Sequence, residues 1–161
     1  MAAARRELDL VPTPATIDII GSIEKGLGGI PNLAVIPTEP LAVPPGARST
    51  SRRQSHAPTL LDHLGEGPRP RLWVVEEDLY ADGLSFVFGL AVRGRGGVVS
   101  IARLPDVTMA AKEAIHEAGH VFGLAHCRNT CVMQFSSDLR HAQAKPATFC
   151  GTCRGRLDRP G

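Results

Sequence analysis

Short apolar runs separated by turn residues occupy the first two thirds of the chain, and they predict a sheet. The runs have strand length and lie at residues 7–12, 33–36, 72–75, 84–92 and 98–104. The glycine-rich segment 93–97 joins the last two, as a hairpin connection does. We interpret it as a turn rather than as an RNA contact.

A helical spacing of apolar residues interrupts these strands twice. Ile17, Ile20, Ile23 and Leu27 predict a helix over residues 15–27. The glycines at 26, 28 and 29 end that helix rather than open one. We therefore interpret them as a C-cap and not as a nucleotide-binding fingerprint. A second, shorter helix is predicted over residues 56–64 with its leucines inward. His63 in this helix has no partner at ligand spacing, so we do not expect it to bind a metal.

Residues 107–124 predict the longest helix, because they hold good helix formers and no proline. Ile115, Ala118, Phe122 and Ala125 recur at intervals of three and four residues and predict its buried stripe. The order of elements is therefore strand, helix, strand, helix, three strands and this helix. We expect an α/β or α+β fold with a mixed sheet packed on helices.

Residues 37–55 and 76–78 are predicted to be loop and turn. The first segment is rich in Pro, Ser, Thr and Arg, and we expect Arg48, Arg52 and Arg53 to be solvated surface charges rather than substrate contacts. The acidic run 76–78 is typical of a solvated turn, although its carboxylates could also hold a cation.

The length and composition indicate one globular domain over residues 1–161. The sheet should occupy residues 1–104 and the last helix and cysteines residues 105–161. No apolar run reaches the length of a membrane span, and residues 1–10 lack the apolar core of a secretory signal. The net charge of +2 does not suggest nucleic-acid binding. We therefore expect a cytoplasmic monomer.

The segment His116-Glu117-Ala118-Gly119-His120 carries the strongest chemical signal. Histidines four residues apart project from one face of a helix and can reach one tetrahedral metal ion. Glu117 is rotated about 100° from His116, so it is placed to hold a metal-bound water rather than to act as a ligand. Gly123 can take a positive φ and end the helix, which lets His126 return to the metal as a third ligand. Three neutral donors, a carboxylate and an open fourth position are typical of a hydrolytic zinc site.

Four cysteines follow, and their spacing indicates a second metal site. Cys127 and Cys131 are separated by three residues, and Cys150 and Cys153 by two, which suits a closed structural zinc site. Buried free thiols or a redox pair are the alternatives. Met133 could be core filling, or it could be an apolar floor beneath the histidines, as in proteases with a Met-turn.

Together these residues resemble the archaemetzincins, a family of zinc metallopeptidases within the metzincins. The likeness runs through the three histidines, Glu117, Gly123, the four cysteines and Met133, and it extends back to residues 78–79, 86–91 and 100–104. The chain departs from the family pattern in a shorter segment after Leu104 and in a Cys127–Cys131 gap that is one residue short.

The resemblance implies two zinc ions and a peptide or protein substrate. His116, His120 and His126 would bind the catalytic zinc, with Glu117 as the general base. The cysteines at 127, 131, 150 and 153 would bind the structural zinc. It also implies an edge strand above the cleft, with Phe86, Phe88 and Gly89 beside the substrate.

Two other functions are compatible with the sequence. The protein could be a zinc-stabilised peptide- or protein-binding module with little or no turnover. It could also be a zinc-ribbon adaptor that binds protein or nucleic acid, with Arg154, Arg156 and Arg159 as its basic residues. We interpret those arginines as a solvated tail.

Overall fold

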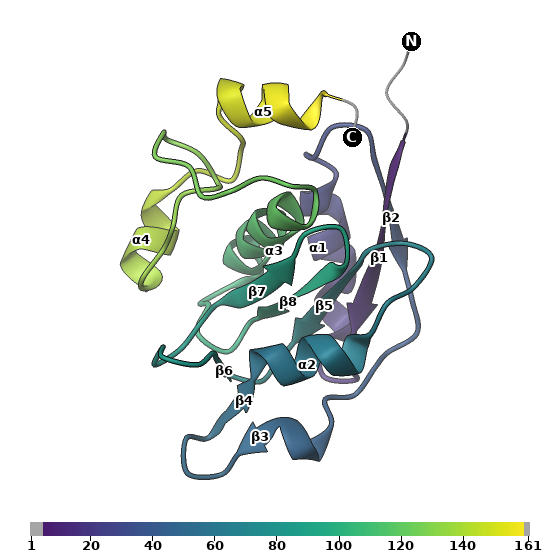
Figure 1. The fold of residues 1–161 in the computed structure, drawn as a ribbon, viewed down its shortest axis with the longest axis vertical. Coiled ribbons are helices and arrows are strands. Elements are labelled where there is room, and N and C mark those ends of the chain that lie inside the picture. Colours follow the sequence, from purple (N-terminus) through teal and green to yellow (C-terminus); the bar gives the residue numbers. More distant parts are fainter. Residues whose placement is uncertain (1–4, 160–161) are drawn as a thin grey trace.

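A mixed five-stranded sheet forms the centre of the protein, in the order β2-β1-β5-β8-β7 (Figure 1). The computed structural model describes residues 5–159. The first four strands are parallel: β2 (Leu33–Pro37), β1 (Arg6–Pro12), β5 (Arg71–Val75) and β8 (Gly96–Ser100). β7 (Gly89–Val92) pairs antiparallel with β8 and forms an edge of the sheet. The mixed sheet predicted from the sequence is confirmed.

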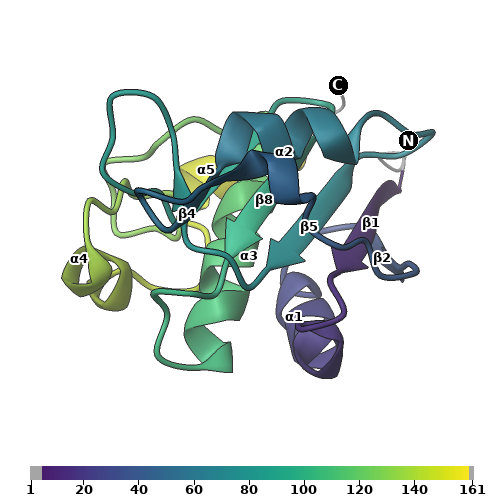
Figure 2. The same cartoon turned by 90° about the horizontal axis from the view of Figure 1, so that it is seen from below.

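Helices cover both faces of this sheet (Figure 2). α1 (Ile20–Leu27) and α3 (Val107–Val121) lie on one face, and α2 (Ala57–Leu64) lies on the other. The predicted order of these strands and helices along the chain is also confirmed.

The alternation of side chains along β5 shows how the two layers of core form. Leu72 and Val74 pack toward α1 and α3, whereas Trp73 and Val75 pack toward α2, and all four are fully buried. Since both faces are covered, β5 is apolar at every central position, as a buried parallel strand should be.

The segment predicted to be a long loop contributes two strands to a second, three-stranded sheet. This sheet comprises β3 (Arg48–Ser49), β4 (Gln54–His56) and β6 (Leu79–Tyr80), preceded by the 3₁₀ turn η2 (Pro45–Ala47). The strands have two or three residues each, so periodicity carried no signal for them.

The predicted strand over residues 84–92 is too long. Regular pairing begins only at Gly89, and within 84–88 Val87 makes a single bridge to Leu79. The carbonyls of Leu84 and Ser85 are bound by side chains instead of by a neighbouring strand. The strand predicted over 98–104 similarly ends at Ser100.

Two predicted helices also differ from the structure at an end. The first begins as the 3₁₀ turn η1 (Ile17–Ile19), and Ile17 is 49% exposed rather than part of the buried stripe. α3 ends at Val121, so Ala125 lies outside the helix and is exposed, while Ile115 and Ala118 are buried as predicted.

Two short helices near the C-terminus, α4 (Leu139–Ala144) and α5 (Gly151–Leu157), were not predicted. Arg154 and Arg156 therefore lie on α5 and not in a tail, whereas residues 160–161 lie outside the described residues. The Arg6 guanidinium donates to the carbonyl of Leu157, which joins α5 to β1. No helix in the described part of the chain is long and apolar enough to cross a membrane.

The carboxylates of the acidic run 76–78 are bound within the protein rather than only by solvent. Their partners are the Thr13 hydroxyl and the guanidinium groups of Arg48 and Arg103. None of them joins a cluster of three metal-ligating groups among the residues described.

The Asp106 side chain caps the N-terminus of α3 by accepting a hydrogen bond from the Met109 N–H at 2.9 Å. We predict that Asp106→Ala lowers the free energy of unfolding by about 1 kcal/mol, because a helix N–H loses its partner. Urea denaturation at fixed zinc concentration would measure this. Asp106→Asn retains the cap and is the control. Equal losses in the two variants would contradict the capping role.

Candidate active site

The end of α3 brings three histidines together. His116 and His120 lie one turn apart on the helix, and Gly123 leaves it with a φ of +100°. The Leu124 N–H then reaches back to the Gly119 carbonyl at 2.9 Å, and the reversed chain delivers His126. The three ligand nitrogens lie within 4.8 Å of one another. The structure therefore assembles the predicted triad.

Two backbone carbonyls fix the tautomers of the helical histidines. His116 Nδ1 donates to the Val132 carbonyl at 2.8 Å, and His120 Nδ1 donates to the Leu124 carbonyl at 2.7 Å. Each neutral ring therefore carries its proton on Nδ1 and presents an Nε2 lone pair. These two Nε2 atoms lie 3.2 Å apart. Two lone pairs at that distance repel each other, whereas a cation between them would be bound by both, so the donor set fits a metal ion.

Burial keeps the triad in the form that binds metal. It lowers the pKa of His116 to about 3, with a further contribution from the charge of Lys145. Burial also lowers the pKa of His120 and of His126. All three shifts favour the neutral ring, which is the ligating form of imidazole.

Glu117 is the carboxylate of this site. It is 4% exposed and lines the same cavity as the triad, and its Oε2 has no hydrogen-bond partner within residues 5–159. Burial, with a contribution from Glu113, raises the pKa of Glu117 to about 8. A cation beside it would favour the ionised form. Gly89 leaves room for this side chain, because a Cβ there would lie 2.8 Å from Glu117 Cγ.

A buried ion pair that the sequence did not predict lies behind the triad. Lys145 Nζ and Glu113 Oε1 are 3.0 Å apart, and both side chains are almost inaccessible to solvent. Lys145 Nζ also lies 3.3 Å from His116 Nδ1 and donates to the Gln134 carbonyl. Glu113 precedes Glu117 by one helical turn, so its position on the same face of α3 could have been predicted from the sequence. No local sequence pattern indicated that Lys145 would lie beside it.

The four cysteines form a second cluster, with all sulfurs within 4.8 Å of one another. The short gap between Cys127 and Cys131 therefore does not prevent the cluster. Backbone N–H groups of Met133 and Cys150 point at Cys131 Sγ, at 3.4 and 3.3 Å. Such donors favour thiolate sulfur.

Burial and hydrogen bonding shift the pKa values of these thiols in opposite directions. Burial raises the pKa of Cys131 and of Cys153. Hydrogen bonding from the Cys153 N–H, with help from Asn129, lowers the pKa of Cys150 to about 6. Several thiolates at this spacing need a cation to offset their mutual repulsion, so the cluster also fits a metal ion. The two clusters together suggest two metal sites.

Met133 belongs to the hydrophobic core and packs against α3 between the two helical histidines, so it fills the core as one of the two interpretations of the sequence expected. It is fully buried, and its Sδ packs against Gly119, where a Cβ would collide with it. The Cys127 N–H donates to the Met133 carbonyl at 2.9 Å. Met133 is thus part of the loop that joins the two clusters.

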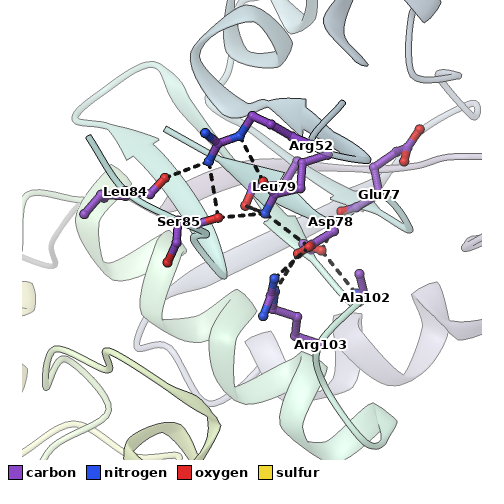
Figure 3. A network of polar contacts seen from close by, with 10 residues as sticks. Arg52, Glu77, Asp78, Leu79, Leu84, Ser85, Ala102 and Arg103 are labelled. Atoms are coloured by element: carbon purple, nitrogen blue, oxygen red, sulfur yellow. Dashed lines mark hydrogen bonds and ion pairs between the residues drawn. The ribbon is translucent and has the colours of Figure 1, made fainter. Parts of the chain in front are cut away.

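A cavity of about 580 Å³ opens above the triad, and residues 84–91 form one of its walls. Side chains of β4 and of the turn before it bind the backbone of this wall (Figure 3). Arg52 donates to the Leu84 carbonyl at 3.0 Å, and Gln54 donates to the Ser85 carbonyl at 2.9 Å. The Arg52 guanidinium also stacks on Tyr80. The sequence predicts Arg52 to be only a solvated surface charge. In the structure its exposed side chain also holds the cavity wall in place.

The residues predicted to lie beside the substrate all line this cavity, but they differ in exposure. Phe88 is 7% exposed and belongs mainly to the core, whereas Phe86 lies under the Arg103 guanidinium. The sequence pattern did not single out Phe135, which is 65% exposed and makes a T-shaped ring contact with His126. An apolar residue alone in a polar segment was its only signal.

Comparisons with known proteins agree with this geometry. The family model described as peptidase family M54 matches residues 70–159. An archaemetzincin of Methanopyrus kandleri is 46% identical over 129 residues, which cover 73% of this chain and 73% of the relative. An archaemetzincin of Haloquadratum walsbyi is 35% identical over 173 residues, which cover 93% and 98%.

Solved structures are similar over nearly the whole chain. The structure of an Archaeoglobus fulgidus archaemetzincin complexed with malonate has a TM-score of 0.85 at 32% identity and covers 93% of this chain and 99% of that one. A zinc-dependent peptidase of Methanocorpusculum labreanum has a TM-score of 0.85 at 25% identity, with the same coverage.

The buried Lys145–Glu113 pair leads to a stability prediction. We expect Lys145→Met to lower the free energy of unfolding by about 3–5 kcal/mol, because the Glu113 carboxylate is left buried without its partner. Adding Glu113→Gln should restore much of the loss. Chemical denaturation would measure both, with the exposed Lys25→Met as the matched control. A loss no larger than that of the control would show that the pair contributes nothing.

Proposed function

Because this chain belongs to the archaemetzincin family of zinc metallopeptidases, peptidase family M54, we propose that it hydrolyses peptide bonds with Glu117 as the general base beside a zinc-binding histidine triad. One observation carries the proposal. The unpartnered Glu117 Oε2 and the converging histidine nitrogens line the same cavity.

The histidines and Glu117 have different roles in the proposed reaction. His116, His120 and His126 would hold the zinc, which when bound acidifies water and polarises the scissile carbonyl. Glu117 Oε2 accepts the proton of the attacking water and then donates it to the nitrogen of the leaving amine. Burial raises the pKa of Glu117 and so makes its carboxylate a stronger base, while a bound cation would favour the ionised form that accepts the proton.

The free edge of β7 would bind the peptide by strand addition. The Phe88 carbonyl accepts a hydrogen bond from the Ser100 N–H in β8, at 2.8 Å. Because pairing alternates along an antiparallel strand, the main-chain groups of Gly89 and Ala91 are directed to the open edge. A peptide that paired with them would cross the cavity beside Glu117.

The cysteine cluster would bind a second, structural zinc through Cys127, Cys131, Cys150 and Cys153. We further propose that the chain forms one catalytic domain that acts as a monomer, without nucleic acid as a partner. The cytoplasmic location expected from the sequence stays a prediction.

The role of Glu117 is testable by an isosteric change. We predict that Glu117→Gln retains bound zinc and lowers kcat/KM by a factor of about 10² to 10⁴, because the amide cannot accept the proton. Elemental analysis and cleavage of a peptide library would measure the two effects. Normal turnover by a zinc-loaded variant would contradict the assignment. Lack of cleavage by the wild type would favour the binding-module alternative.

The two metal sites should be separable by stoichiometry. We expect about two zinc ions per chain in the wild type and about one in His120→Ala, which removes one ligand of the triad. Cys127→Ser should also lose about one zinc, together with a large loss of thermal stability, since a structural zinc contributes folding free energy. His63→Ala, outside both clusters, is the control. An equally stable Cys127→Ser protein would argue against the structural site.

A further inference from the structure

Arg93 lies at the end of the cavity wall, immediately after β7, and its side chain is exposed. Of the described residues that line the cavity, Arg93 alone is a lysine or arginine. Within that part of the chain its guanidinium makes no hydrogen bond or ion pair. A cation is thus presented to the cleft without a partner among residues 5–159.

The position of Arg93 is fixed by the active-site helix. The turn after β7 is anchored by a hydrogen bond from the Gly94 N–H to the Val121 carbonyl, at 2.8 Å. The guanidinium packs on Gly123, where a Cβ would lie 3.2 Å from Nε and 3.3 Å from Cζ. Gly123, which ends the helix, therefore also leaves the space in which the Arg93 guanidinium packs. The guanidinium is held beside the loop that delivers His126.

A comparison with Arg95 shows that this exposure is specific to Arg93. Arg95 belongs to the same turn, but its side chain points to Asp62 and Glu66, with nitrogen–oxygen distances of 3.7 and 3.9 Å. Arg95 is not among the residues that line the cavity. Arg95 is thus paired with carboxylates on α2 and beyond it, whereas Arg93 has no carboxylate partner among residues 5–159 and faces the cleft.

We propose that Arg93 binds a carboxylate of the peptide substrate and gives this peptidase a preference for acidic residues near the scissile bond. The inference rests on the proposed function. A guanidinium suits this role, because its planar donors match a carboxylate. An acidic side chain has the required chemistry.

The strand sets the distance of the carboxylate from the scissile bond. Glu117 packs against Gly89, at the start of β7, and Arg93 follows four residues later, about 13 Å along an extended chain. Since the Arg93 side chain leans back onto Gly123, the carboxylate belongs about two to four residues from the bond that is cut. A peptide antiparallel to β7 would carry it on the N-terminal side of that bond, because β7 runs from Gly89 toward Arg93.

The decisive experiment is cleavage of a peptide library whose products are sequenced by mass spectrometry. It is followed by matched pairs of peptides that differ only by Glu or Gln at the selected position. We expect zinc-loaded wild type to favour Glu by about threefold to tenfold in kcat/KM, as for a partly exposed ion pair. Arg93→Gln should remove this preference, and Arg93→Glu should favour Lys. Arg95→Gln makes the same change in net charge within the same turn and should keep the wild-type preference.

Binding measurements separate recognition from turnover. In the Glu117→Gln background, the Glu peptide should bind more tightly than the Gln peptide by a similar factor, and Arg93→Gln should abolish the difference. Thermal unfolding and zinc content establish that each variant is folded and loaded. An unchanged preference in Arg93→Gln, or equal use of Glu and Gln by the wild type, would overturn the proposal for Arg93. Absence of any cleavage by the wild type would instead count against the proposed function.

Discussion

Repulsion between unshared electron pairs is the constraint on which this structure depends. Two imidazole nitrogens are held 3.2 Å apart, and four sulfurs are gathered within 4.8 Å of one another. The two nitrogens repel each other without a cation, and the sulfurs would do so as thiolates, so the surrounding chain must hold both sets of ligands in place. For the histidines this is achieved by two carbonyls, those of Val132 and Leu124, which fix the ring orientations before any metal binds.

One short loop connects the two clusters. It runs from Cys127 to Met133 and supplies two sulfurs to one cluster and the Val132 carbonyl to His116 in the other. The Cys127 N–H and the Met133 carbonyl close the loop on itself. A disturbance of the sulfurs would therefore reach the histidine rings through the backbone, over a path of a few residues. The thiol cluster is in this sense part of the active site, although it lies outside the cavity.

The sequence predicted the features that rest on local chemistry. The spacing of His116 and His120, the glycine at 123 and the two cysteine pairs each follow from helix geometry or ligand number. The sheet was predicted as well, because β5 contains a continuous apolar run and β8 contains the pair Val98 and Val99. The second sheet was missed, since strands of two or three residues have no periodicity. Lys145 was missed because its partner Glu113 is 32 positions away in the chain, and only the fold brings them together.

The hydrogen bonds that hold the cavity wall in place have an evolutionary consequence. Arg52 and Gln54, which bind the carbonyls of Leu84 and Ser85, precede the region matched by the peptidase family model, residues 70–159. The shape of the wall thus depends on a part of the chain that bears none of the metal ligands. Substitutions there can remodel what the cleft accepts while the hydrolytic machinery is inherited intact. Catalysis and selectivity can diverge at separate rates within one chain.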